Sequence, residues 1–300
     1  MTSLDRLRQA MISGENGHSP VLLSETLKAS LGNHGLSAAE QLLSNAGVSI
    51  EFSSGGSSLE YITNPEIRAE FEKDLADYEA LYAAAGITMP AVEQMEKAGI
   101  SLTNLAELKE QYPEHELAIT PLTADIPTMR NIASVVTNNQ SIPNNPLKKY
   151  SQTKADSDGL WIHKTVVNNW HTIMANTTRD YLASGVPTVS LNTGEIWTAY
   201  LISSQNMPDN LNMSYQQMKQ KGLTAITIPG YISYQMKRIQ QGQKPIDTRT
   251  CTWALGEFTN SSGGACAPYV DWAPDYGQIC VGGDWVDCSV AYLGVRSPVG

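Results

Sequence analysis

The sequence lacks a long hydrophobic run and has little basic charge. No stretch is long and apolar enough to span a bilayer. The first residues carry Asp5 beside Arg6 and Arg8 and lead into no apolar core, so they do not resemble a secretory signal. Lys and Arg total 20 against 30 Asp and Glu, and the net charge is -10. Because phosphate binding requires clustered Lys and Arg, we expect no nucleic-acid partner. The lack of a long apolar run predicts no membrane insertion, and the lack of a signal predicts a cytoplasmic or virion-associated protein.

Metal and nucleophile motifs are also missing. The four cysteines are Cys251, Cys266, Cys280 and Cys288, and they form neither a CxxC pair nor a Cys/His zinc spacing. They could form two disulfides, in three pairings, or remain free thiols. His163 and His171 have no third ligand nearby in the sequence, which favours ordinary histidines over a metal pair or a base. No Gly-x-Ser-x-Gly motif occurs. We therefore expect no metal, no cofactor and no catalytic residue.

A third absence is local. No Lys, Glu or Met follows Glu257, although these types make up roughly one residue in seven before it. One explanation is that Lys and Glu are poor strand formers, which a loop-rich β tail would avoid. The other explanation is a restricted codon usage in this segment, to which we return below.

The composition is that of a folded protein, and the first part predicts helices. At 300 residues, with 41% hydrophobic and 17% charged residues, the chain is long enough for two units with proper cores. Asn64 and Pro65 supply an N-cap and a first helical residue. A stripe at helical spacing follows and ends at Gly86; it consists of Ile67, Phe71, Leu75, Tyr78 and Leu81.

A short cue recurs around this helix. Residues 46–49, 85–88 and 98–101 each consist of Ala, Gly, an apolar residue and then Ser or Thr. The pattern is typical of a helix C-cap followed by a new N-cap, and it predicts short helices joined by tight turns. A helix-turn-helix DNA reader is one interpretation. The glutamates on these helices oppose it and favour packing or assembly.

We expect a domain boundary near residue 145. A strand at 117–122 and a helix after Pro127 precede a stretch rich in Asn and Pro, residues 138–146, which breaks every periodicity. The basic residues Lys148, Lys149 and Lys154 follow and favour a solvated linker. The predicted units are residues 1–145, a helical region for assembly or anchoring, and residues 146–300.

The second unit predicts a mixture of strands and helices. We expect strands at 160–167 and 195–203 and helices at 170–183 and 229–240. After Trp253 only short alternations separated by Gly, Pro and Asp remain. The predicted fold class is therefore α+β with an irregular, loop-rich C-terminal part.

Four short segments carry a resemblance to a known family. They are residues 221–229 (Lys-Gly-Leu-Thr-Ala-Ile-Thr-Ile-Pro), 253–257 (Trp-Ala-Leu-Gly-Glu), 282–285 (Gly-Gly-Asp-Trp) and 293–296 (Leu-Gly-Val-Arg). Together they resemble the C-type-lectin-like domain of variable proteins diversified by retroelements, over about residues 150–300. The resemblance implies a hypervariable binding surface, a protein or cell-surface ligand, and phage association in some members.

The resemblance also sorts the tail into scaffold and surface. In that family a reverse transcriptase rewrites AAC codons to NNC codons, which cannot encode Lys, Glu, Met, Gln or Trp. Trp272, Gln278 and Trp285 would then be fixed scaffold, and large Trp side chains, Trp253 included, suit burial. Tyr, Asp and Ser on loops suit adaptable binding. We expect a ligand-binding surface between Gly263 and Tyr292, formed by Tyr269, Asp271, Tyr276, Asp284, Asp287, Ser289 and Tyr292.

Three alternatives remain open. Asp271, Asp275, Asp284 and Asp287 could bind calcium, but the Glu-Pro-Asn and Trp-Asn-Asp cues of calcium-dependent lectins are absent, which favours metal-free binding. Formylglycine-generating enzymes share the lectin-like fold, but the spacing of Cys280 and Cys288 departs from their cysteine pair. A structural phage or assembly subunit is the third class, and a homo-oligomer or larger assembly fits either non-enzymatic class.

Overall fold

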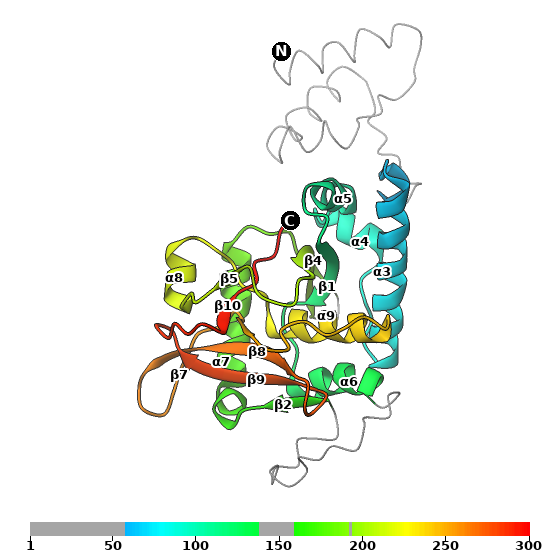
Figure 1. Ribbon diagram of the computed structural model, residues 1–300. Coiled ribbons are helices and arrows are strands. Elements are labelled where there is room, and N and C mark those ends of the chain that lie inside the picture. The colour runs from blue at the N-terminus through cyan, green and yellow to red at the C-terminus, as the bar shows by residue number, and fades with distance from the viewer. Residues whose placement is uncertain (1–57, 138–158, 192–193) are drawn as a thin grey trace, which may run out of the picture. The chain divides into compact units, whose positions relative to one another are not determined.

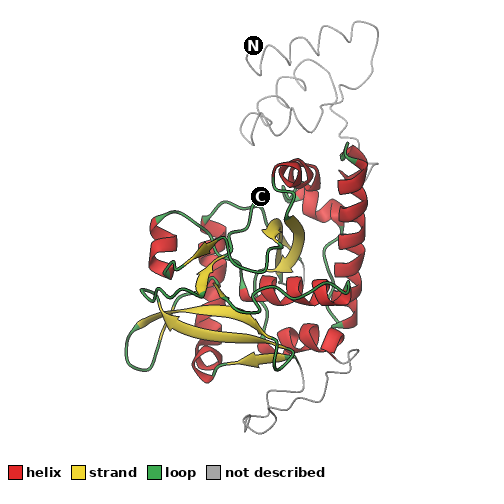
Figure 2. Cartoon of the chain, viewed as in Figure 1, coloured by secondary structure: helices red, strands yellow, loops and turns green. Residues whose placement is uncertain are grey.

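The computed structural model describes residues 58–137, 159–191 and 194–300 (Figure 1). By its contacts the chain divides into two units, Met1–Gly56 and Ser57–Gly300, and the described residues belong to the second. Among them are seven α-helices, α3 to α9, and two sheets, so the unit is mixed α and β. Figure 2 shows the strands as two groups with helices around them. No helix in these residues has both the length and the apolar character needed to cross a membrane.

The first long helix, α3 (Pro65–Ala84), forms where the sequence predicts it. The Asn64 side chain accepts hydrogen bonds from the backbone N–H groups of Glu66 and Ile67, at 3.0 and 3.3 Å. The predicted stripe, from Ile67 to Leu81, is buried. The helix ends before Gly86, whose φ of 77° is a left-handed conformation that side chains disfavour.

A 3-10 turn, η1 (Ser58–Tyr61), precedes α3, and two short helices follow α3. They are α4 (Val92–Lys97) and α5 (Leu102–Gln111). The cue at 98–101 works as predicted, because Gly99 is left-handed and Ser101 caps α5. The cue at 85–88 is half right: α4 begins only after Ala91, so Thr88 is not its cap. The cue at 46–49 lies outside the described residues.

The smaller sheet joins distant parts of the chain. Its order is β1–β4–β3, from β1 (His115–Pro121), β4 (Ile196–Ser203) and β3 (Val189–Ser190), all antiparallel. The predicted strands at 117–122 and 195–203 are thereby confirmed to within a few residues. Helix α9 (Ile228–Gln240) packs against β1, α3 and α6 (Ile126–Thr137), so the centre of the unit is built from both halves of the sequence.

A buried ion-pair network ties these elements together. Lys237 on α9 is fully buried, and its Nζ lies 2.9 Å from Asp74 Oδ1 on α3 and 3.6 Å from Glu116 Oε2 on β1. The neighbouring Arg238 pairs with Glu116 at 2.7 Å. Buried charges are stable only when paired in this way.

The boundary expected near residue 145 falls within residues 138–158, outside the described residues. The described residues on its two sides share one core, since β1 pairs with β4 from His115↔Ser203 to Pro121↔Trp197 and α3 contacts α9. The contacts divide the chain between residues 56 and 57, and a boundary near residue 145 stays a prediction.

The larger sheet has the order β2–β9–β8–β6–β10–β5, with β7 paired to β8. Its strands are β2 (Leu160–Ile162), β5 (Asn210–Leu211), β6 (Cys251–Trp253), β7 (Phe258–Thr259), β8 (Ala265–Ala273), β9 (Gln278–Trp285) and β10 (Leu293–Val295). Strands β8 and β9 form a long antiparallel hairpin, whereas β2 with β9 and β10 with β6 are parallel. No helix occurs after Trp253, as predicted.

One predicted strand is wrong in its length. Residues 160–167 read as a strand, but β2 stops at Ile162 and α7 (Lys164–Ala183) begins six residues before the predicted Trp170. His163 is the reason, because its Nδ1 accepts from the backbone N–H of Thr165 at 3.2 Å and caps the helix. Capping and the burial of Val166 outweigh the strand preference of the β-branched residues that follow.

Candidate ligand-binding face

The two faces of the β8–β9 hairpin differ in the burial of their larger side chains. Val270, Ile279 and Val281 lie on one face and are fully buried. Tyr269 and Asp271 alternate with them along β8 and are only partly buried. Register places Asp271 opposite Cys280 and Tyr269 opposite Gly282. We call this second side the open face; it consists of Cys251, Tyr269, Asp271, Cys280, Gly282 and Asp284.

Tyr269 lies at the centre of the open face. Its ring lies over Gly282, where an added Cβ would come within 2.3 Å of the tyrosine Cζ, so only glycine allows this approach. The ring also contacts Trp253 edge-on, with centroids 6.4 Å apart. Burial raises the pKa of Tyr269 to about 12, and the negative charges of Asp271 and Asp284 add to this effect. The predicted residues Tyr269, Asp271, Asp284 and Tyr292 are therefore brought together.

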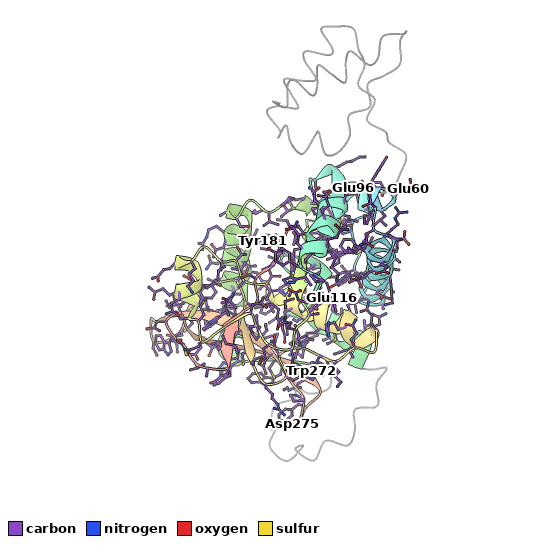
Figure 3. The ribbon with its side chains drawn as sticks, turned by 45° about the horizontal axis from the view of Figure 1, so that its top comes forward. Glu60, Glu96, Glu116, Tyr181, Trp272 and Asp275 are labelled. Carbon is purple, nitrogen blue, oxygen red and sulfur yellow. The ribbon has the colours of Figure 1, made fainter. Side chains whose placement is uncertain are left out.

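A cavity of about 270 Å³ lies at one end of the open face. Residues 247–251 and 271–276 line it, including the predicted Asp271 and Tyr276. Trp272 and Asp275, which also line it, lie at the end of the unit opposite to Glu60 and Glu96 (Figure 3). Burial, with the charge of Asp247 second, raises the pKa of Asp271 to about 7, so this carboxyl changes its charge near neutral pH.

Asp247 holds the cavity wall in place, and the sequence analysis missed it. Its buried carboxylate accepts hydrogen bonds from Arg296 at 2.8 Å, from Thr252 at 2.9 Å and from Thr250 at 3.2 Å. Burial raises its pKa despite the opposing effect of Arg296. A sequence signal did exist: Arg296 is the only Lys or Arg after Glu257, and it sits in an apolar segment where a buried cation needs a carboxylate.

The β9–β10 loop, residues 286–292, carries the remaining predicted residues. Ser289 Oγ donates to the backbone oxygen of Asn212 at 2.9 Å, which anchors the loop next to β5. Asp287 is exposed, and Tyr292 is 57% exposed. Burial, then the hydrogen bond and charge of Asp284, raises the pKa of Cys288 to about 11, so the loop lies beside the Asp284 end of the open face.

The predicted tryptophan scaffold needs one correction. Trp253 is fully buried, with Nε1 donating to Met213 O at 2.8 Å, and Trp272 is partly buried. Trp285, however, is 47% exposed. It stands at the last position of β9, where one side of its ring rests against Gly264. Val166 of α7 covers Gly283 two residues earlier.

The residues considered for metal or thiol chemistry do not converge. His163 caps α7, and all four cysteines are free thiols, which resolves the open question of disulfides. In the described ranges no three His, Cys, Asp or Glu side chains are grouped as a metal site would require. Burial raises the pKa of Cys251 well above that of an ordinary thiol.

A second cavity, of about 580 Å³, lies elsewhere, between β1, α6, α7 and β4. None of the seven predicted binding residues lines it. Comparison of the chain with protein-family models, with curated proteins and with solved structures gives no match.

Proposed function

We propose that this chain is a non-catalytic ligand- or receptor-binding protein that binds through the open face and the β9–β10 loop. The observation that carries the proposal is the burial contrast within one hairpin. Val270, Ile279 and Val281 fill the core, while Tyr269, Asp271 and Asp284 on the same two strands are only partly buried. Such an arrangement permits changes on one face without loss of the packing on the other.

The chemistry of the accessible side chains supports binding. Tyrosine offers a large contact area with few rotatable bonds, and Asp and Ser offer adaptable hydrogen bonds. Asp271, Asp275, Asp284 and Asp287 lie in this region, where Arg296 is fully buried and Arg249 is an exposed cation that lines the cavity beside Asp271 and Asp275, so carboxylates outnumber exposed cations here. The surface therefore suits a ligand with positive charge or many hydrogen-bond donors.

We further propose that the fold is C-type-lectin-like and that the surface is diversified by a retroelement. The absence of Lys, Glu and Met after Glu257 supports this, because NNC codons cannot encode them. Trp285 would then be an invariant yet exposed part of the surface, since such codons cannot encode Trp either. Its partly exposed ring between Asp284 and the β9–β10 loop adds an aromatic contact beside the variable positions.

The thiols support a non-catalytic role over the formylglycine-generating alternative. A cysteine reacts as its thiolate, and a raised pKa keeps the thiol protonated at neutral pH. Burial raises the pKa of both Cys251 and Cys288. Turnover of a peptide substrate that disappears on replacing Cys280 or Cys288 would contradict this proposal.

The binding role can be tested with two matched libraries in the full chain displayed on yeast. The first carries NNC codons at Asp284, Asp287 and Tyr292, and the second carries them at Val270, Ile279 and Val281. We expect most members of the first library to remain folded and to yield binders to a purified probe protein such as lysozyme. The second library should lose folded display. Equal loss of folding in the two libraries would refute the proposal.

The origin of the surface can be tested separately by sequencing the DNA around the gene. We expect a reverse-transcriptase gene and an imperfect repeat of the coding segment for residues 263–292. The two copies should differ almost only at adenines of the repeat. Differences spread evenly, or no repeat at all, would remove the retroelement while leaving the binding role to the libraries.

A further inference from the structure

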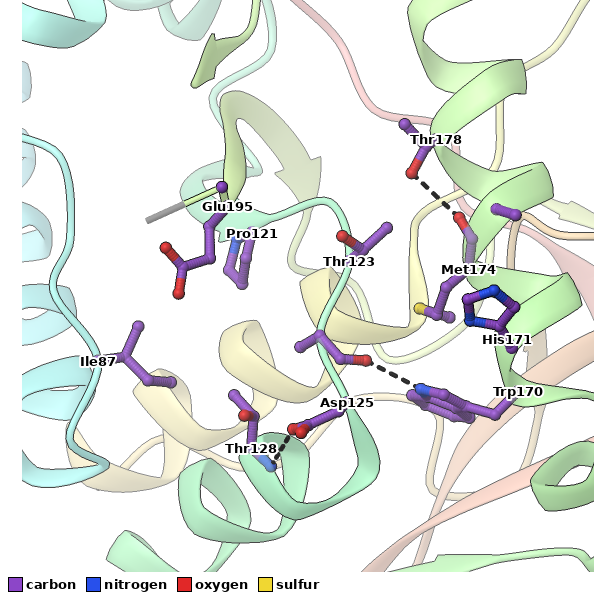
Figure 4. Close-up of a pocket in the computed structure, with 13 residues that line it drawn as sticks. Ile87, Pro121, Thr123, Asp125, Thr128, Trp170, His171, Met174, Thr178 and Glu195 are labelled. Carbon is purple, nitrogen blue, oxygen red and sulfur yellow. Dashed lines mark hydrogen bonds between the residues drawn. The ribbon is translucent and has the colours of Figure 1, made fainter. Parts of the chain in front are cut away.

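The cavity of about 580 Å³ is separate from the open face and has the size of a small-molecule site. Figure 4 shows its walls. Thr123 and Asp125 come from the segment that joins β1 to α6, Trp170 and Met174 come from α7, and Glu195 directly precedes β4. Segments far apart in the sequence thus form one enclosure.

Hydrogen bonds fix the walls of this cavity. Trp170 Nε1 donates to the backbone oxygen of Ala124 at 2.9 Å, which joins α7 to the β1–α6 segment. Asp125 Oδ1 accepts from the backbone N–H of Thr128 at 2.8 Å and so caps α6. A wall held by such bonds is organised before a ligand arrives, which reduces the entropy lost on binding.

The charge of the lining selects the ligand. Two carboxylates, Asp125 and Glu195, border the cavity together with the imidazole of His171, and no Lys or Arg is among the described residues that line it. A helix N-terminus ordinarily attracts anions, but at α6 Asp125 already occupies that position with its own negative charge. An anionic ligand would therefore meet repulsion on two sides.

The rest of the described lining combines apolar and aromatic side chains with the polar side chains of Thr123, Thr128, Thr178 and His171. Ile87, Pro121, Met174 and Trp170 contribute hydrocarbon and ring surface next to the carboxylates. Apolar surface favours a ligand with a hydrophobic body, and a charged head between two carboxylates forms charge-assisted hydrogen bonds. Both requirements are met by one class of molecule.

We propose that this cavity is a second binding site, for a small organic cation with an apolar body and an amine or amidine head. The site is independent of the proposed role of the open face, because the two share no lining residue. The head lies between Asp125 and Glu195, and the body lies against Trp170 and Met174.

The test is calorimetric titration of the full chain at about pH 8 with three probes of equal size: benzylamine, benzyl alcohol and benzoate. Agmatine serves as a second, aliphatic cation. We expect both cations to bind, benzylamine at least about tenfold more tightly than benzyl alcohol, and benzoate not at all. The proposal would be overturned if neither cation binds, or if benzylamine, benzyl alcohol and benzoate bind with equal affinity.

Variants locate the binding in the cavity. Asp125→Asn keeps a capping oxygen for α6 and removes one charge, and Glu195→Gln removes the other. Each should weaken benzylamine at least about fivefold. Ala175→Trp fills the cavity from an exposed position of α7 without changing the charge, and it should abolish binding. Glu107→Gln, an exposed carboxylate outside the cavity, is the control.

Thermal unfolding of each variant verifies that it is folded. If Ala175→Trp is folded and binds benzylamine as tightly as the original protein, the cation is held elsewhere and the proposal is wrong. It is equally wrong if Glu107→Gln weakens binding as much as Asp125→Asn does.

Discussion

Trp253 and Trp285 are the same residue type in opposite surroundings. Trp253 is fully buried and contacts both Tyr215 and Tyr269 edge-on, whereas Trp285 is 47% exposed. We expect Trp253→Ala to lower the free energy of unfolding by about 3–5 kcal/mol and Trp285→Ala by less than about 1 kcal/mol. Urea denaturation measures both values. Similar losses would mean that Trp285 is packed as the sequence first indicated.

Asp271 makes stability depend on pH in a defined direction. Burial raises its pKa from the ordinary value of 3.8 to about 7 in the folded protein, so the folded state binds the proton more tightly than the unfolded state does. The contribution of Asp271 to the free energy of unfolding is fully present below about pH 4. It is lost as the pH rises to about 7, by at most about 1.4 kcal/mol per pH unit.

Asp271→Asn removes this dependence. The variant should therefore gain stability relative to the original protein as the pH rises from about 5 to about 8. Thermal unfolding at several pH values gives the difference between the two proteins. Asp275→Asn is the matched control, since Asp275 lines the same cavity but is exposed. A constant difference for Asp271→Asn across this range would contradict the assignment.

Single residues could be predicted where the signal is local. The Asn64 cap and the glycine stop of α3 need only neighbours in sequence, and both are confirmed. The exposure of Trp285 and the partnership of Asp247 with Arg296 depend on which segments cover them in space. The sequence contains their residue types but not that neighbourhood.

At the scale of elements, the Asp247–Arg296 pair joins three segments. Arg296, next to β10, donates to Asp247 before β6 at 2.8 Å and to the backbone oxygen of Ser203 on β4 at 2.7 Å. Both paired side chains are fully buried. Arg296→Met would leave the Asp247 carboxylate buried without its cation, which costs about 3–5 kcal/mol.

A double-mutant cycle separates the pair from its surroundings. Asp247→Asn keeps two hydrogen-bonding atoms at a position with φ of 55°, a conformation that Asn tolerates. With Arg296→Met it should recover part of the lost stability, since no charge is then left uncompensated. Strictly additive losses in urea denaturation would show that the pair is not coupled.

Elements with strong periodicity or clear caps were predicted, and short or long-range ones were not. β4 and α9 agree with prediction to within one residue because each has a regular apolar pattern. β2 was predicted too long because its β-branched continuation also suits a strand. The parallel pairing of β2 with β9 joins residues over a hundred positions apart, and no local pattern encodes it.

At the scale of the whole molecule, the predicted binding surface and the helices before it are not independent parts. All of the open-face and loop residues lie after residue 250, yet the core beneath them is continuous with α3 and β1. Lys237 shows why: it is fully buried and takes its counter-charges from Asp74 and Glu116, both of which precede residue 145. The Asn- and Pro-rich composition of residues 138–146 indicated a linker and could not reveal this pairing.

Two truncations distinguish the possible boundaries. A chain of residues 57–300 keeps every element described above, and we expect it to unfold cooperatively with a melting temperature close to that of the full chain. A chain of residues 146–300 lacks β1, so the inner strand β4 loses its hydrogen-bonding partner on that side. It also lacks Asp74, so the buried Lys237 cation loses its carboxylate partner. We expect it to be unfolded or aggregated by circular dichroism and light scattering. If residues 1–56 serve assembly, the full chain should form an oligomer with more copies than residues 57–300 do. Light scattering measures the mass of each particle and thus its number of copies. A folded, monomeric 146–300 fragment would contradict the shared core and support the predicted boundary near residue 145.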